Sequence, residues 1–209
     1  MWVVDDVKNI KRCAVMGQHP LQFPWGFDEE DDGCIHMKRK LTQCITALYD
    51  MGIWEYQVAC DPGIGLYTAE VIHSLKSQCP NIQIVCVLPH EEQATKWMPQ
   101  LRERYFSMLS NCAEVRCSDP RKHPNAQFQA YQQMIRDSDM LLSVYDPALA
   151  DGRAEDKAVL YASALGRPIL YLSPISLETS WSNRPDGITE KNILKRKRSI
   201  SVMLHLRFS

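Results

Sequence analysis

The sequence has no apolar run long enough to span a membrane and no excess of charge of either sign. Its 209 residues carry 24 Lys and Arg against 25 Asp and Glu, a formal net charge of −1. A membrane-spanning helix needs about 20 consecutive, mostly apolar residues, and a near-neutral chain has no general electrostatic attraction to nucleic acid or anionic lipid. Neither a membrane nor a nucleic acid is therefore an expected partner.

The sequence also has no C-x-x-C pair, the spacing typical of structural zinc sites. Most of its cysteines fall in apolar runs, where a free thiol behaves as a small hydrophobic side chain. They stand at positions 13, 34, 44, 60, 79, 86, 112 and 117. The N-terminal stretch MWVVDDVKNIKR has acids within its short apolar segment and no cleavage pattern, so it is a poor signal peptide. We expect buried, reduced thiols, no metal site and a cytoplasmic location.

Short apolar or β-branched runs alternate with longer segments that carry apolar residues every three or four positions. The runs lie at 12–17, 54–60, 82–89, 113–117, 139–146 and 167–173, and the segments at 34–52, 66–78, 93–111, 125–138 and 154–166. This alternation predicts β-α-β units. The expected α/β fold is Rossmann-like and doubly wound, with a mainly parallel sheet and helices on both faces.

The alternation ends after Pro174. The remainder of the chain is polar, contains an Arg-Pro-Asp-Gly turn sequence and carries the basic run Lys195–Arg198. We divide the chain into a domain of residues 1–175 and a C-terminal tail of residues 176–209. The tail is expected to be disordered, to add an edge strand at 199–208, or to offer a basic contact surface.

Ligands of open parallel sheets bind outside the carboxyl ends of the strands, where the strand order reverses. The loops after the predicted strands supply candidate ligand-binding residues there. These are Gly17, His19, Pro20, Asp61, Gly63, Gly65, Glu91, Tyr145 and Arg153. His19 suits either an anionic ligand or a structural hydrogen bond. Glu70 and Asp146 are candidate catalytic acids or ribose ligands, but each also suits local capping or pairing.

The loop DPGIGLYTAEV places two glycines just before a predicted helix. Glycine lets the backbone approach a ligand closely, and free N–H groups at a helix start favour phosphate. The third glycine of a dinucleotide-binding fingerprint is replaced by Thr68 or Ala69, so the spacing also fits a bare turn. The sequence leaves both interpretations open.

Several motifs together resemble one known family. Gly17-Gln18-His19-Pro20 and Phe23-Pro24-Trp25-Gly26 are similar to a Gly-His-Arg-Pro motif followed by Phe-Pro-Trp-Gly, and Thr68-Ala69-Glu70 is similar to an Ala-Ala-Glu helix start. Further matches are Pro89, Glu91, Gln93, Trp97, Arg104, Tyr105, Met134, Ser138 and Asp139. Over residues 10–173 the chain thus resembles the SLOG superfamily, in the branch of small bacterial proteins related to YpsA.

The chain departs from that family on the ligand side. The family's acid two residues after the loop glycine is Gly65 here, and its Gly-Gly-Thr phosphate loop reads Arg153-Ala154-Glu155. An acid at position 155 repels a phosphate. Three explanations stay open: a different or less anionic ligand, compensation by Arg153, or a decayed site.

The resemblance implies a binding protein or sensor for a nucleotide-derived small molecule such as an ADP-ribose-like compound, linked to stress or cell-division physiology. An alternative is a hydrolase of the N-glycosidic bond of a nucleotide, with Glu70 or Asp146 as acid or base. A third is a protein-interaction module that uses the aromatic loop Phe23–Phe27. No cofactor is expected beyond a nucleotide-type ligand. A protein partner or a homo-oligomer stays open.

Overall fold

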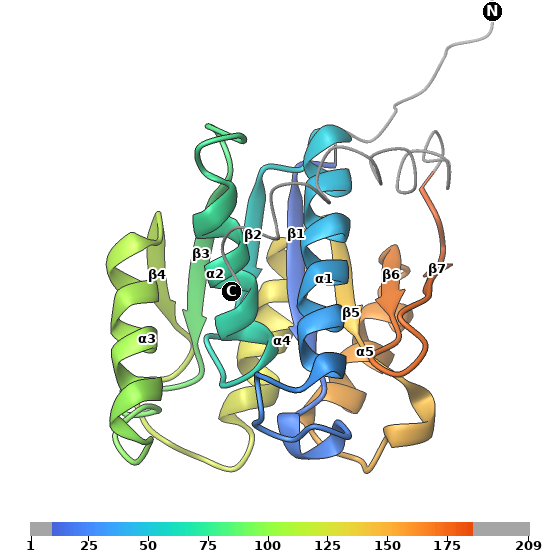
Figure 1. The fold of residues 1–209 in the computed structure, drawn as a ribbon. Coiled ribbons are helices and arrows are strands. Elements are labelled where there is room, and N and C mark those ends of the chain that lie inside the picture. The colour runs from blue at the N-terminus through green and yellow to red at the C-terminus, as the bar shows by residue number, and fades with distance from the viewer. Residues whose placement is uncertain (1–9, 186–209) are drawn as a thin grey trace, which may run out of the picture.

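One seven-stranded sheet organises the part of the chain that the computed structural model describes, residues 10–185 (Figure 1). The strands are β1 (Arg12–Gly17), β2 (Glu55–Val58), β3 (Gln83–Leu88), β4 (Glu114–Cys117), β5 (Met140–Val144), β6 (Ile169–Leu172) and β7 (Thr179–Ser182). Their order is β4-β3-β2-β1-β5-β6-β7. All neighbours are parallel except β6 and β7, so the mainly parallel, Rossmann-like α/β sheet is confirmed.

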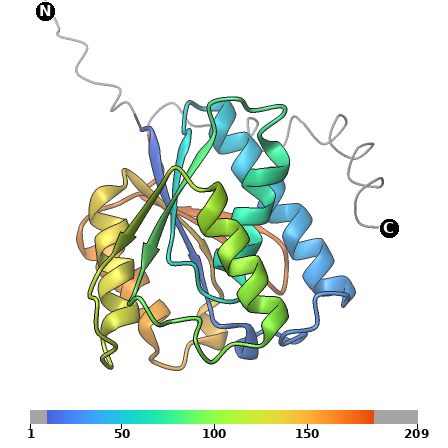
Figure 2. The same ribbon diagram turned by 90° about the vertical axis from the view of Figure 1, so that its left-hand side faces the viewer.

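Five helices cover the two faces of the sheet. They are α1 (Asp32–Asp50), α2 (Ile64–Leu75), α3 (Pro99–Asn111), α4 (Ala126–Asp137) and α5 (Ala154–Ala164). Helices α1, α2 and α3 lie on one face, and α4 and α5 on the other, as the turned view shows (Figure 2). Each face has its own hydrophobic core, because successive side chains of a strand point to opposite faces.

Strand β1 lies at the centre of this arrangement. Cys13 and Val15 belong to the core beneath α1–α3, whereas Ala14 and Met16 belong to the core beneath α4 and α5. This burial on both faces explains why β1 has no polar side chain after Arg12, its exposed first residue.

Most predicted elements agree with the structure to within about three residues, as expected for boundaries read from periodicity. The predicted helix 93–111 is the exception, since α3 begins only at Pro99 and residues 91–96 form turns. Met98 has an extended backbone (φ −58°, ψ 147°), the conformation that a following proline favours. Proline at the first position then starts the helix.

The predicted tail contains a strand that the sequence did not indicate. Strand β7 pairs antiparallel with β6 at the edge of the sheet. The proposed edge strand 199–208 and the basic run Lys195–Arg198 lie outside the described residues.

None of the eight cysteines, all within residues 10–185, forms a disulfide; six are buried, Cys112 is half-buried and Cys117 is exposed. No helix in residues 10–185 is long and apolar enough to cross a membrane.

Candidate functional site

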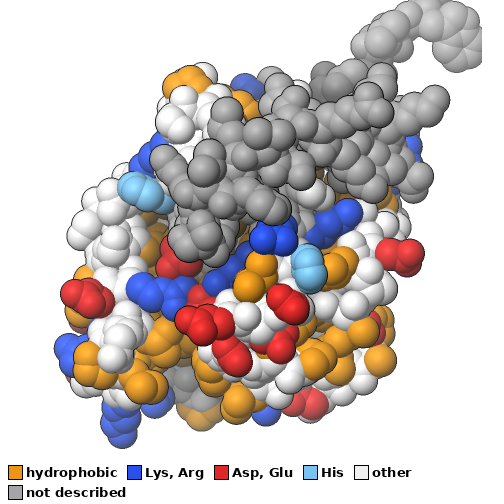
Figure 3. Space-filling view, viewed as in Figure 1, with side chains coloured by type: hydrophobic (Ala, Val, Ile, Leu, Met, Phe, Trp, Pro, Cys, Tyr) orange, Lys and Arg blue, Asp and Glu red, His pale blue; other side chains and the backbone are white. Residues whose placement is uncertain are grey.

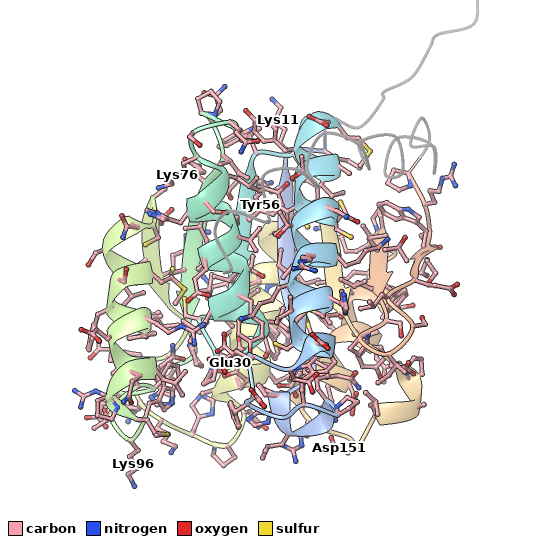
Figure 4. The ribbon with its side chains drawn as sticks, viewed as in Figure 1. Lys11, Glu30, Tyr56, Lys76, Lys96 and Asp151 are labelled. Carbon is pink, nitrogen blue, oxygen red and sulfur yellow. The ribbon has the colours of Figure 1, made fainter. Side chains whose placement is uncertain are left out.

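The strand order reverses at β1, which lies between β2 and β5. The chain builds β1 to β4 in one direction and then crosses back to place β5 on the other side of β1. Because these strands are parallel, the loops after them meet at one edge of the sheet. Glu30 and Asp151, from the loops after β1 and β5, both lie at this edge, and Lys11, just before β1, lies at the opposite one (Figure 4).

The loop after β1 is fastened to the loop after β5 by two glutamines. The Gln18 amide donates from Nε2 to the Asp146 carbonyl (3.0 Å) and accepts at Oε1 from the Asp146 N–H (2.9 Å). The Gln22 Nε2 donates to the Leu149 carbonyl (2.8 Å). Gln18 is buried and continues the pairing of β1 with β5 beyond the strands. Gln18 belongs to the motif Gly17–Pro20 but was not predicted as a site residue, because its partner is the backbone of a residue 128 positions away.

The glycines at this edge allow close packing. A Cβ on Gly17 would overlap Cγ1 of Ile64, and a Cβ on Gly63 would lie 2.6 Å from Cγ of Pro20. Gly63 also has a φ of +90°, which side chains rarely adopt. These contacts pack the start of α2 against β1 and the loop after it. The packing alone therefore requires glycine at positions 17 and 63, whether or not a ligand binds.

His19 and Arg153 lie at the rim of this edge, near enough for the Arg153 charge to act on the imidazole. Burial lowers the pKa of His19, and the Arg153 charge lowers it further, so the imidazole is neutral at neutral pH. Its Nδ1 accepts the Leu21 N–H (3.3 Å) at the start of the 3₁₀ helix Pro20–Gln22. The Arg153 Nε donates to Asp151 Oδ2 (2.6 Å) in an exposed ion pair.

Two helices begin at this edge without a capping side chain. Helix α2 begins after Gly63 and α5 after Arg153, and neither residue caps its helix through a side chain. Free N–H groups at helix starts bind acceptor groups of ligands. At α2 the Leu66 N–H is not free, because it donates to the Asp61 carbonyl (3.2 Å).

Asp61, after β2, and Glu155, in the first turn of α5, place two carboxyl groups at the same edge of the sheet, near enough for the charge of Glu155 to act on Asp61. Glu155 is buried and accepts a hydrogen bond at Oε1 from the Tyr131 hydroxyl (3.3 Å). Asp61 Oδ1 lies 2.8 Å from where a Cβ of Gly65 would be, so it fills the space that a side chain there would need. Burial, then the charge of Glu155, raises the pKa of Asp61 to about 7, and burial raises the pKa of Glu155. The pair can therefore give or take a proton near neutral pH.

The two predicted catalytic acids are not brought together. Asp146 accepts from the Ala148 N–H (2.9 Å) and the Ser173 hydroxyl (3.2 Å), a capping arrangement. Glu70 forms a two-point ion pair with Arg104 (2.6 and 3.0 Å) on the outer side of α2. Both carboxylates already have local partners, which matches the structural alternative that the sequence left open.

Tyr145 lies beside Asp156 in the first turn of α5, whereas Glu91 lies near Cys117 at the end of β4. Tyr145 is buried, with its ring 6.2 Å from that of Tyr171. Glu91 is exposed in the turns after β3. The structure thus gathers His19, Pro20, Asp61, Gly63 and Arg153, and it adds Gln18, Tyr131 and Glu155.

A cavity of about 370 Å³ lies elsewhere, between α2 and α3. Most of its lining surface is apolar, and Glu70 and Arg104 also line it. Arg104 also binds Glu29 of the loop after β1 (2.5 and 3.1 Å), and Lys38 pairs with the same glutamate. Acidic and basic side chains gather on this face of the molecule (Figure 3). The ion pairs tie the first loop to α1, α2 and α3.

The aromatic loop Phe23–Phe27 does not form the exposed surface that the third hypothesis requires. Phe23 and Trp25 are only 4% and 8% exposed, with ring centroids 5.1 Å apart, whereas Phe27 is 48% exposed. Trp25 packs on Gly33, where a Cβ would lie 2.9 Å from its Cε3. The two buried rings are part of the core and are not available to a partner.

Comparison with known proteins gives one family and several relatives. Residues 13–161 match the family model YpsA, described as the YspA SLOG family. A UPF0398 protein of Bacillus pumilus is 28% identical over 167 residues, which cover 78% of this chain and 88% of the relative. A UPF0398 protein of Bacillus anthracis is 30% identical over a segment that covers 66% of this chain and 75% of the relative. The UPF0398 protein YpsA of Bacillus subtilis is 26% identical over a segment that covers 66% of this chain and 77% of the relative.

Proposed function

Because this chain belongs to the YspA SLOG family, we propose that it binds a nucleotide-derived small molecule at the carboxyl edge of β1, β2 and β5. The observation that carries the proposal is the meeting of three loops at the point where the strand order reverses. Gln18 and Pro20 hold the loop after β1 against the other two. Open parallel sheets bind their ligands at such points.

The groups around this point suit a nucleoside or nucleotide. Uncapped N–H groups at the starts of α2 and α5 offer donors, and Arg153 offers a cation on the rim. Asp61 offers carboxylate oxygens, which accept hydrogen bonds from ribose hydroxyls. A sensor role in stress or cell-division physiology would follow from binding such a ligand, without any reaction.

A thermal-shift panel on the full chain tests the proposal, using NAD, ADP-ribose, cyclic ADP-ribose, AMP and other mononucleotides. A ligand at 100 times its Kd adds about 2.7 kcal/mol, which raises the Tm of a domain of this size by about 5–10 °C. Such a shift with one compound supports the site. A flat panel contradicts it.

Arg153→Gln locates the ligand, and Arg102→Gln is its control, an exposed arginine on α3. We expect the first variant to reduce the Tm increase and the second to leave it unchanged. Gly63→Asp is a poorer test, because it would strain the backbone and displace Pro20.

One observation favours a second candidate function, hydrolysis of an N-glycosidic bond. A carboxyl group whose pKa is about 7 suits general acid–base catalysis at neutral pH, and Asp61 has that property. Chromatography of nucleotides incubated with the protein would detect a released base. Loss of release in Asp61→Asn but not in Glu70→Gln would assign the acid to Asp61. The opposite result would restore Glu70, and no release from any nucleotide would exclude this activity.

A further inference from the structure

Three cysteine thiols meet in the core beneath α1, α2 and α3. Cys86 belongs to β3, Cys60 follows β2, and Cys112 lies between α3 and β4. Cys60 and Cys86 are members of this core, and Cys112 packs against it. Cys60 and Cys112 each form a side-chain hydrogen bond with Cys86, which therefore lies between them. Thiols in contact with one another have the first requirement for a disulfide.

The backbone holds this cluster together from both sides of β3. Strands β2 and β3 are parallel neighbours in which Val58 pairs with Cys86, and Cys60 comes two residues after Val58. On the other side, the Ala113 N–H donates to the Ile84 carbonyl (2.8 Å), so the chain that leaves α3 enters the sheet beside β3. The contacts between the thiols are thus part of the fold and do not depend on a mobile loop.

Only one of the three thiols is open to solvent. Cys60 and Cys86 are both 0% exposed, whereas Cys112 is half-buried. A small reagent from solvent therefore reaches the cluster at Cys112, and the sulfur next to it is that of Cys86. Cys60 lies on the closed side of the cluster, so the accessible pair is Cys86 and Cys112.

The hydrogen bonds in the cluster favour the thiolate of Cys86. The hydrogen bond from Cys60, and to a lesser extent that from Cys112, lowers the pKa of the Cys86 thiol, although burial opposes this shift. Burial raises the pKa of the Cys112 thiol to about 11, so this thiol keeps its proton. That proton can go to the Leu109 carbonyl (3.1 Å) or to Cys86. The thiolate is the form of cysteine that peroxides oxidise.

We propose that Cys86 and Cys112 are a modification site, at which a small hydroperoxide such as hydrogen peroxide produces an intramolecular disulfide. The inference is independent of the proposed function, since neither thiol is part of the proposed nucleotide site and the test needs no nucleotide.

The reaction has two steps, and both use groups of the cluster. The Cys86 thiolate attacks one peroxide oxygen, so that an S–O bond forms and the O–O bond breaks, and the departing hydroxide takes the Cys112 proton to give water. The Cys112 thiolate then attacks the Cys86 sulfur, which forms the S–S bond and breaks the S–O bond. The second hydroxide takes from solvent the proton that Cys86 had released there. Two thiols are oxidised to one disulfide, and one peroxide is reduced to two waters.

The test treats the reduced full chain with hydrogen peroxide, blocks the remaining thiols with iodoacetamide and identifies linked peptides by mass spectrometry without reduction. We expect a Cys86–Cys112 link that a reductant removes. It should form at least about ten times faster in the folded chain than in the chain unfolded by guanidinium, because only the fold holds these thiols in contact. Cys112→Ser should abolish the link. Cys117→Ser, which removes the exposed thiol of β4, is the control and should leave it unchanged.

Three results would overturn the proposal. They are a link between Cys60 and Cys86 in place of the expected one, alkylation of both Cys86 and Cys112 after peroxide has oxidised Cys117, and equal rates of linkage in the folded and unfolded chains. If Cys112→Ser fails to fold, the wild-type peptides decide alone, because they identify the two linked cysteines directly.

Discussion

The side chain of Gln18 links the ends of two neighbouring strands, β1 and β5, at the edge of the sheet where a ligand is expected. Both its donor and its acceptor are used by the backbone of Asp146, so β1 and β5 stay paired one residue beyond the strands. The loop after β1 therefore has a fixed position before any ligand arrives. Because the loop is already ordered, a ligand that binds there loses little binding free energy to the ordering of the loop.

Gln18→Ala should destabilise the fold. It leaves the Asp146 N–H and carbonyl without partners in a mostly buried place, at about 1–3 kcal/mol for each lost hydrogen bond. Guanidinium denaturation measures the loss in free energy of unfolding. Gln100→Ala, at an exposed position of α3, is the control and should change it by less than about 0.5 kcal/mol. Equal effects of the two variants would contradict the role given to Gln18.

Trp25→Ala should cost stability as a core substitution does, about 3–5 kcal/mol. Its ring packs between Phe23 and Gly33, and only 8% of the residue is exposed. Thermal melting of Trp25→Ala and Phe27→Ala separates the two explanations of the aromatic loop. A contact surface predicts small effects for both, whereas the structure predicts a large effect for Trp25 alone.

At the scale of elements, Arg104 links the loop after β1 to two helices. Its guanidinium binds Glu29 of that loop and Glu70 of α2 through two points each, while Arg104 itself belongs to α3. Planar guanidinium groups suit such two-point contacts, and ammonium groups do not.

Arg104→Lys should loosen the first loop without unfolding the domain. The lysine keeps the charge but cannot hold two carboxylates in two-point contacts. Hydrogen exchange should become faster at the amides of residues 28–31, and Arg102→Lys, an exposed neighbour in the same helix, should leave it unchanged. Unaltered exchange in Arg104→Lys would mean that Gln18 and Pro20 alone position the loop.

The sequence was most informative at this scale, and for clear reasons. The spacing of apolar residues follows from which side chains are buried, and strands and helices have different spacings. Six strands and five helices could therefore be predicted. Strand β7 was missed because Thr-Ser-Trp-Ser at an exposed edge carries no apolar pattern. The early start predicted for α3 was wrong because Pro99 outweighs the periodicity before it.

The site was only partly predictable from the sequence. Asp61 and Arg153 were predicted to lie at this edge because they come after strands, a position that topology makes informative. Tyr131 was missed because it reaches the site from the interior of α4, and no sequence spacing shows that contact. The sequence marked Glu155 only as a departure from the family's Gly-Gly-Thr phosphate loop. Its proximity to Asp61, which follows a different strand, results from the fold and could not be predicted from the sequence.

At the scale of the whole molecule, the carboxyl pair makes stability depend on pH. The pKa of Asp61 rises from 3.8 to about 7 on folding, so the folded state binds more protons between these values. By linkage, the free energy of unfolding falls as the pH rises through this window. A tenfold change in a protonation constant corresponds to about 1.4 kcal/mol, so a rise of about three pKa units gives a loss on the order of 4 kcal/mol over the whole window.

Asp61→Asn should flatten this dependence. Melting temperatures measured between pH 5 and pH 8 should fall in the wild type and fall less in the variant, because asparagine does not titrate. Glu103→Gln, at an exposed position of α3, is the control and should behave as the wild type does. A wild-type Tm that rises steadily over this range would contradict the assignment of a raised pKa to Asp61.

The central place of β1 also bears on how the chain is made. During synthesis, β1 to β4 emerge in an order that lets them pair at once, and β1 is then an open edge. That edge stays unpaired until β5, which begins at Met140, has left the ribosome. An unpaired apolar edge invites pairing with other chains. The docking of β5 beside β1 covers this edge and also completes the proposed site. Pairing of the β1 edge with other chains is therefore a hazard for the nascent protein until the site can form.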